Sequence, residues 1–214
     1  MTGSRTSTEI LLGTTVTISI VTDADGNGSR VGRTITAPLP NDPRPVNFAF
    51  VSCQHLNEGK LNAYRRMIYE DERAPAAEQL GFVLHLGDFI YEMVQYPEEV
   101  QTRYDRTIYE VARIPDGHKI GNFHIPLTVD GYRAIYKGYL LDPDLQDARA
   151  RWPFVAMWDN HEFSFQGWQG VLKVGAFEQP GQSVKVAANQ AWFEYLPARV
   201  MRGNRPLERF DPPA

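Results

Sequence analysis

The sequence has little of what identifies several classes of protein. Only one of its 214 residues is a cysteine, so the chain cannot form an internal disulfide. It has 22 basic against 26 acidic residues, and this lack of basic surplus argues against binding of nucleic acid. No apolar run approaches the roughly 20 residues of a membrane span, so we expect no transmembrane segment. The N-terminus also has no apolar segment typical of a signal peptide.

What remains is the composition of a globular protein. The chain is 43% hydrophobic and 22% charged, which excludes a disordered tail, a collagen or a coiled coil. With a net charge of −4, the surface as a whole does not attract anions. If the ligand is a phosphorylated small molecule, a bound metal ion would supply the attraction that bulk charge does not.

The N-terminal region has the pattern of a β-hairpin. Residues 9–22 are predicted to be a strand, because apolar residues at 16, 18 and 20 alternate with polar residues at 15, 17 and 19, and residues 31–36 alternate again. The Asp- and Gly-rich tract 23–28 between them is typical of a turn. Four prolines within residues 38–45 then indicate a linker.

After residue 45, apolar runs typical of buried strands alternate with helical patterns, which predicts an α/β domain. The stretch 96–126 has no clear periodicity, and we expect a long loop that acts as a lid. The predicted strands are 48–51, 82–86 and 154–158, and the predicted helices are 60–73, 132–141 with its continuation to 151, and 183–195, which Pro197 ends.

Each of the three predicted strands is followed by residues of types that commonly act as metal ligands. Ser52-Cys53-Gln54-His55 follows the first, Gly87-Asp88 with Tyr91 and Glu92 follows the second, and Asp159-Asn160-His161-Glu162 follows the third. Ligands of α/β proteins gather at the carboxyl ends of strands, and three such tracts together predict a metal site.

The residue types suit particular metals. Cys53 and Tyr91 are anionic donors for a trivalent or borderline metal, whereas the oxygens of Asp88 and Asn160 suit a hard divalent ion such as calcium. Gly87 allows the tight turn that directs Asp88 inward, and His161 is placed to protonate a leaving oxygen.

These motifs resemble a known family. The tracts Phe50-Val-Ser-Cys-Gln54, His85-Leu-Gly-Asp-Phe-Ile-Tyr-Glu92 and Trp158-Asp-Asn-His-Glu162 are similar to those of the PhoD-type alkaline phosphatases, in the calcineurin-like metallophosphoesterase superfamily. The resemblance implies an αββα sandwich whose N-terminal part is residues 46–214. It also implies that residues 1–45 are the C-terminal part of an Ig-like β-sandwich domain plus a linker.

The resemblance also implies roles for individual residues. Cys53 and Tyr91 would bind Fe³⁺, Asp88 would bridge that ion and Ca²⁺, and Asn160 would bind on the calcium side. His161 would be the catalytic acid or a contact to phosphate. Members of the superfamily need further ligands from later in the chain, but no histidine follows His161, so we expect the sequence to be a fragment.

The function implied is metal-dependent hydrolysis of phosphate esters by an exported enzyme. One alternative is a thiol hydrolase with Cys53 as nucleophile and His161 as base, which leaves Asp88 and Tyr91 without roles. A second alternative is a truncated, non-catalytic fragment or binding module.

Three nearby residues have less specific interpretations. His85 lies within an apolar strand and is expected to be a hydrogen-bonded core histidine. Glu92 and Glu162 are expected either to support a ligand residue or to face outward.

Overall fold

The structure is a computed structural model that describes residues 5–11, 14–35, 41–196, 198, 201–202 and 205–206. The chain divides into two compact units. The first contains residues 1–50, 61–84 and 142–154, and the second contains residues 51–60, 85–141 and 155–214. In the part of the chain that is described, no helix is both long enough and apolar enough to cross a membrane.

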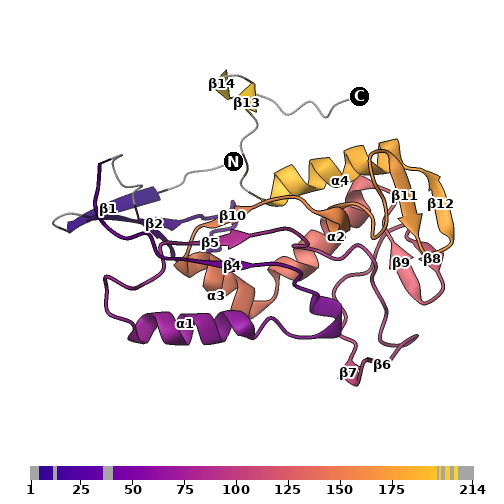
Figure 1. Cartoon of the computed structure of the whole chain (residues 1–214), viewed down its shortest axis with the longest axis horizontal. Helices are drawn as coiled ribbons and strands as arrows, with labels where there is room; N and C mark the ends of the chain where they lie inside the picture. The colour runs from indigo at the N-terminus through magenta and orange to yellow at the C-terminus, as the bar shows by residue number, and fades with distance from the viewer. Residues whose placement is uncertain are drawn as a thin grey trace. The chain divides into compact units, whose positions relative to one another are not determined.

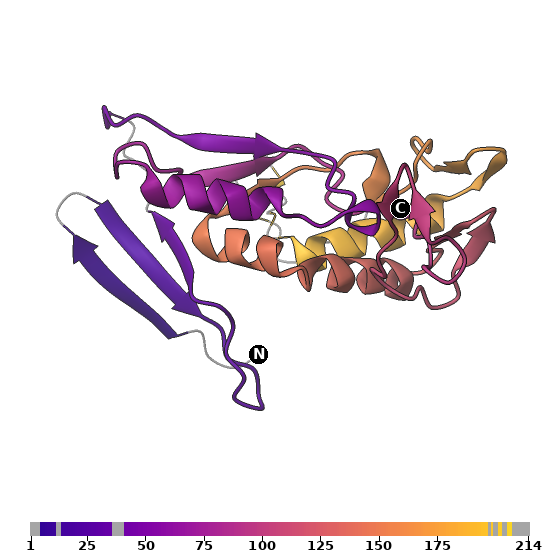
Figure 2. The ribbon, with the colours of Figure 1, turned by 90° about the horizontal axis from the view of Figure 1, so that it is seen from below.

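The first unit begins with an antiparallel sheet of three strands in the order β1-β2-β3, which lie side by side in Figure 2. The strands are β1 (Arg5–Leu11), β2 (Thr14–Ile20) and β3 (Gly32–Ile35). The single strand predicted over 9–22 is therefore wrong, because residues 9–11 belong to β1 and residues 14–20 to β2. In the sequence a single glycine, Gly13, separates the two tracts, and this is only a weak signal of a strand boundary.

The predicted turn between β2 and β3 is confirmed. The carboxylate of Asp23 accepts hydrogen bonds from the backbone N–H groups of Asp25 and Asn27, at 3.0 and 2.8 Å. This Asx arrangement closes the turn and orders the hairpin. Residue 36 and the first prolines of the predicted linker lie outside the described residues. The described residues show one sheet here, so the β-sandwich and the division at residue 45 stay predictions.

Two helices of the first unit are joined by ion pairs of Arg65 with Asp144 and of Arg151 with Asp71. Helix α1 (Ala63–Arg73) starts three residues after the predicted position, and α3 (Pro143–Arg151) carries the C-terminal half of the predicted helix 132–151. Asp142 explains why that helix is divided. Its side chain caps α3 and Pro143 occupies the first turn, where a missing N–H costs nothing. The preceding α2 (Val129–Leu140) belongs to the second unit.

The three predicted strands after residue 45 are confirmed as a parallel sheet in the order β10-β5-β4. They are β4 (Phe48–Val51), β5 (Phe82–His85) and β10 (Phe154–Ala156). All three begin in the first unit, and the residues that follow them all belong to the second. The prediction that these strands are buried is wrong for one face of the sheet.

Strand β4 shows this most clearly within the first unit. Phe48 is 48% exposed and Phe50 is 70% exposed, although the ring of Phe48 stacks on Phe82 at 5.2 Å. Exposure alternates along β4, so one face of the strand is covered and the other is not. Sequence alone predicts an apolar strand, but whether each face is covered depends on what packs against it.

The core of the second unit lies between α2 and α4 (Gln182–Tyr195), which Figure 1 shows next to each other. Tyr132, Ile135 and Tyr136 of α2 are fully buried, and the Tyr132 hydroxyl donates to the carbonyl of Phe163 at 2.6 Å. The predicted helix 183–195 is confirmed, whereas Pro197 lies outside the described residues.

The predicted long loop over 96–126 is wrong, because it contains two hairpins. The strands are too short for a period-two pattern to show. They are β6 (Thr102–Arg103), β7 (Arg106–Thr107), β8 (His118–Ile120) and β9 (Phe123–Ile125). The further hairpins β11 (Val171–Val174) with β12 (Phe177–Pro180), and β13 (Met201–Arg202) with β14 (Arg205–Pro206), were not predicted either. The short helices η1 (Leu56–Glu58) and η2 (Asn160–Glu162) lie after β4 and β10.

Candidate active site

Three of the four predicted metal ligands lie together in the second unit. The Sγ atom of Cys53 and the hydroxyl oxygen of Tyr91 each lie 3.5 Å from the same carboxylate oxygen, Oδ2 of Asp88. We call these three side chains the donor cluster. Asp88 is buried, Tyr91 is half-buried and Cys53 is exposed, so the cluster is open to solvent on the cysteine side.

The two loops that carry the donor cluster are bonded to each other through their backbones. The N–H of Cys53 donates to the carbonyl of Gly87, and the N–H of Gln54 donates to the carbonyl of Asp88, both at 3.2 Å. The side chain of Gln54 also donates to the carbonyl of Phe89 at 2.8 Å. These bonds fix the loop after β4 against the loop after β5, and so fix the distance between the thiol and the carboxylate.

The backbone at the donor cluster is strained. Cys53 and Asp88 have φ angles of 56° and 53°, in the left-handed region that side chains other than glycine rarely adopt. Such strain persists where surrounding contacts enforce it, and it occurs most often at functional sites.

Gly87 explains how its loop can pass so close to Asp159, in the segment after β10. Its φ is 96°, and a Cβ atom at this position would collide with the side chain of Asp159. Only glycine tolerates both the positive φ and the lack of space for a Cβ atom, so the tight turn before Asp88 requires glycine at position 87.

The fourth predicted ligand, Asn160, is joined to the donor cluster through its neighbour. The backbone N–H of His161 donates to Oδ1 of Asp88 at 3.2 Å. The side-chain amide of Asn160 donates to the carbonyl of Phe165 at 2.7 Å, which leaves its Oδ1 as the atom available to a metal. In the described part of the chain, Asn160 makes no hydrogen bond to the other three predicted ligands.

His161, the predicted acid, is buried beside the donor cluster. Its ring stacks on Tyr91 with 4.0 Å between ring centroids, and its Nδ1 lies 2.7 Å from the carboxylate of Glu92. Burial lowers the pKa of His161, but the hydrogen bond and charge of Glu92, with the charges of Asp88 and Glu162, raise it above its ordinary value. The imidazole therefore holds a proton more readily than a free histidine does.

Glu92 and Glu162 are fully buried, which excludes the outward-facing alternative for both. Glu92 contacts His161 and also accepts from the backbone N–H of Phe165 at 2.5 Å. Glu162 accepts from three backbone N–H groups, those of Asp88, Phe89 and Asp159, at 3.0, 2.6 and 2.7 Å.

The environment of Glu162 also changes its protonation. Burial raises the pKa of its carboxyl to about 7, against the opposite effect of its backbone hydrogen bonds. Asp159 and Glu162 form a capping box around η2. The spacing of an Asp and a Glu three residues apart is a sequence signal for this inward position of Glu162, and it was not used in the prediction.

His85 differs from expectation. It is fully buried as predicted, but neither ring nitrogen has a hydrogen-bond partner among the described residues. Its ring instead packs against Phe89, with 5.0 Å between centroids, and burial lowers its pKa to about 4. The prediction of a hydrogen-bonded core histidine is wrong, because a neutral imidazole packs here as an apolar ring.

The donor cluster suits a cation by its chemistry. Burial, and then the negative charges of Asp88 and Cys53, raise the pKa of Tyr91 well above its ordinary value. A positive ion in the donor cluster would stabilise the phenolate form of Tyr91, which burial and the neighbouring negative charges disfavour. Within the described residues, no three His, Cys, Asp or Glu side chains are grouped as they would be to hold a metal ion.

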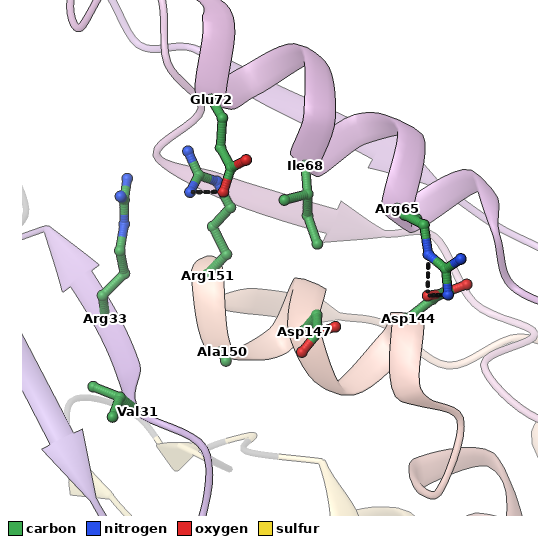
Figure 3. Close-up of a pocket in the computed structure, with 9 residues that line it drawn as sticks. All are labelled: Val31, Arg33, Arg65, Ile68, Glu72, Asp144, Asp147, Ala150 and Arg151. Atoms are coloured by element: carbon green, nitrogen blue, oxygen red, sulfur yellow. Dashed lines mark hydrogen bonds and ion pairs between the residues drawn. The ribbon is translucent and has the colours of Figure 1, made fainter.

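A cavity of about 860 Å³ in the second unit opens over His55, Tyr91 and His161. A smaller cavity of about 420 Å³ in the first unit holds none of the predicted site residues. Figure 3 shows two ion pairs among the charged groups that line it, Arg65 with Asp144 and Arg151 with Glu72. The larger cavity is therefore the one that adjoins the candidate site.

Comparisons with known proteins agree with the motifs. The sequence matches the family model of PhoD-like phosphatases over residues 48–210. It is 32% identical over 173 residues to alkaline phosphatase D of Bacillus subtilis (strain 168), covering 80% of this chain and 26% of that protein. A solved structure of PhoD is similar with a TM-score of 0.65 and 28% identity, covering 91% of this chain and 33% of the other. The chain spans about a quarter to a third of the length of these relatives, and it belongs to the PhoD-like phosphatase family.

Proposed function

We propose that this chain contributes the donor cluster and the acid of a metal-dependent phosphate ester hydrolase. The observation that carries the proposal is the shared contact of Cys53 and Tyr91 with one oxygen of Asp88, directly beside His161. Family membership supports a phosphoester substrate, either a monoester or a diester. Export from the cytoplasm and completion of an αββα sandwich belong to the same proposal and are supported by the resemblance alone.

The residues fit two different metals. Cys53, Asp88 and Tyr91 would hold Fe³⁺, since thiolate and phenolate donors suit it, and the oxygens of Asp88 and Asn160 would serve Ca²⁺. When bound, the metals would neutralise charge on the phosphoryl oxygens and lower the pKa of water. The remaining ligands and the activity of the whole enzyme are part of the proposal, because the chain covers a minority of its relatives' length.

The protein's own residues supply a proton and hold the site in shape. Glu92 fixes Nδ1 of His161, so Nε2 is the nitrogen left to donate a proton to the leaving oxygen of the ester. The raised pKa of His161 favours the protonated form that this role needs. Glu162 holds the backbone of Asp88 and Phe89, which keeps the carboxylate of Asp88 in place.

A spectroscopic experiment tests the metal assignment. Phenolate bound to ferric iron absorbs visible light, so addition of Fe³⁺ should colour the wild-type chain but not Tyr91→Phe. The matched control is Tyr69→Phe, which alters an exposed tyrosine of α1. A colourless wild-type chain would count against Tyr91 as an iron ligand. Hydrolysis of a phosphate ester with added Fe³⁺ and Ca²⁺ then tests the reaction, and an inactive chain would favour the non-catalytic alternative.

The thiol hydrolase alternative fits the geometry less well. The thiol of Cys53 contacts the carboxylate of Asp88, and the Nδ1 atom of His161 is bonded to Glu92. Inactivation by a chelator but not by iodoacetamide would exclude Cys53 as nucleophile. The opposite pattern would support it.

A further inference from the structure

The large cavity beside the candidate site has walls made by hairpins. The β6–β7 hairpin contributes Arg103 and Tyr104, the β8–β9 hairpin contributes Ile120 and Phe123, and the β11–β12 hairpin contributes Val174. Figure 1 shows β8–β9 beside β11–β12, and the ring contact between His118 and Phe177 joins them. The walls are therefore mainly aromatic and aliphatic, whereas the His55, Tyr91 and His161 side carries the polar groups.

Tyr104 occupies a position that its residue type disfavours. Tyr104 and Asp105 are the two loop residues of the β6–β7 hairpin, with φ angles of 50° and 59°. A two-residue turn with both angles positive favours Asn and Gly, and a bulky side chain there is strained. The ring is also 74% exposed, so packing does not explain its presence. A strained, exposed aromatic residue on a cavity wall indicates a role in binding.

Arg103 joins the two aromatic walls. Its guanidinium lies 4.9 Å from the centroid of Tyr104 and 5.0 Å from that of Phe123, and it pairs with Glu58 at 3.1 Å. These contacts hold the planar group at the wall. The described residues use two of its five N–H donors, those to Glu58 and to the Tyr104 hydroxyl at 3.3 Å. The remaining donors can serve an oxygen of a ligand.

We propose that this cavity binds the organic group of the phosphate ester, and that this group carries an aromatic ring that stacks on Tyr104 and Phe123. The inference rests on the proposed function and adds a substrate class, namely aryl and arylalkyl esters. Size supports it, because a cavity of about 860 Å³ is in the range that holds drug-sized ligands and is far larger than phosphate needs. Aromatic faces select planar rings, and Arg103 selects a ring that bears a hydrogen-bond acceptor.

The test compares two non-hydrolysable probes, 2-naphthylmethylphosphonate and methylphosphonate. Calorimetric titration of the chain with added Fe³⁺ and Ca²⁺ measures the affinity for each. We expect the wild-type chain to prefer the naphthyl probe, and Tyr104→Asn to lose about fivefold to tenfold of that preference. Tyr104→Phe should retain it, because the ring remains.

The matched control is Asp105→Asn, at the other residue of the same turn. Asn tolerates a positive φ, so both Asn variants should keep or raise thermal stability, but only Tyr104→Asn should lose the aromatic preference. A destabilised Tyr104→Asn with unchanged probe preference would show that Tyr104 is structural and would overturn the proposal.

The remaining outcomes separate this proposal from the proposed function. If methyl phosphate is hydrolysed but the two probes bind equally, the aromatic pocket is wrong and the phosphatase stands. If methyl phosphate is not hydrolysed and neither probe binds, both proposals fail together.

Discussion

The Oε2 atom of Glu162 lies 3.0 Å from the backbone nitrogen of Asp88, across 74 residues of sequence. A buried carboxylate of the loop after β10 thus holds the loop after β5 by its backbone. The same oxygen accepts from Asp159, so one atom ties together the two loops that carry the predicted ligands. The position of Asp88 therefore depends on a residue that need not touch a metal or a substrate.

Replacing Glu162 tests this dependence. Glu162→Gln leaves one oxygen and places an amide donor against at least one backbone N–H, so we expect a loss of about 1–3 kcal/mol in the free energy of unfolding. Denaturant titration at pH 8 measures it. The control Glu178→Gln removes an exposed partner of Lys173 and should change stability by less than about 0.5 kcal/mol. Equal stability of the two variants would contradict the role of Glu162.

Glu92 should set the protonation of His161. Burial lowers the pKa of His161 and Glu92 raises it, so Glu92→Gln should leave burial dominant and lower that pKa. NMR titration of the imidazole measures the pKa directly and needs no activity. Glu99→Gln, which alters the partner of His124, is the control and should leave His161 unchanged. A pKa of His161 that stays constant in Glu92→Gln would disprove the positioning role.

Relief of the backbone strain at Cys53 should affect the free energy of unfolding and the binding of Fe³⁺ in opposite directions. Cys53→Gly removes an exposed thiol from a residue with φ of 56°, so the free energy of unfolding should stay equal or rise by up to about 1 kcal/mol. Binding of Fe³⁺ should weaken at the same time. Cys53→Ser keeps the strain and should not gain stability. A Cys53→Gly variant that is clearly less stable would mean that the thiol packs structurally.

Because burial lowers the pKa of His85, we expect the protein to lose stability in acid. Burial lowers its folded-state pKa to about 4, from an ordinary 6.5, so its contribution is complete above pH 6.5 and is lost as the pH falls toward 4. Between pH 7 and pH 5 this amounts to about 2 kcal/mol. His85→Leu should reduce the difference, measured by denaturant titration at both pH values. His118→Gln, at an exposed histidine, should keep it. An unchanged pH dependence in His85→Leu would refute the prediction.

The elements predicted well have either apolar residues at helical spacing or a continuous apolar run. Helices α1 and α4 and the strands β4, β5 and β10 were expected from their sequences, with shifts of a few residues at their ends. The hairpins within 96–126 were missed because their strands have only two or three residues and contain no continuous apolar run, so they depend on their partners. Tyr104 illustrates the limit, since its residue type argues against the turn that it occupies.

The candidate site was predicted in part. The strand-end rule brought Cys53, Asp88 and Tyr91 together, and the structure places their donor atoms around one oxygen. The sequence pattern could not reveal that Glu92 and Glu162 are buried, because burial of a carboxylate depends on hydrogen bonds from distant parts of the chain. Asn160 as a ligand stays a prediction.

The open face of β4 has a practical consequence for anyone who handles this protein. Phe48 and Phe50 present aromatic surface to water beside Phe82, and such surface adsorbs dyes, plastics and other chains. This strand should therefore contribute to self-association of the chain at high concentration. How long the chain stays in solution at a given protein or detergent concentration should depend on how well those rings are shielded from water.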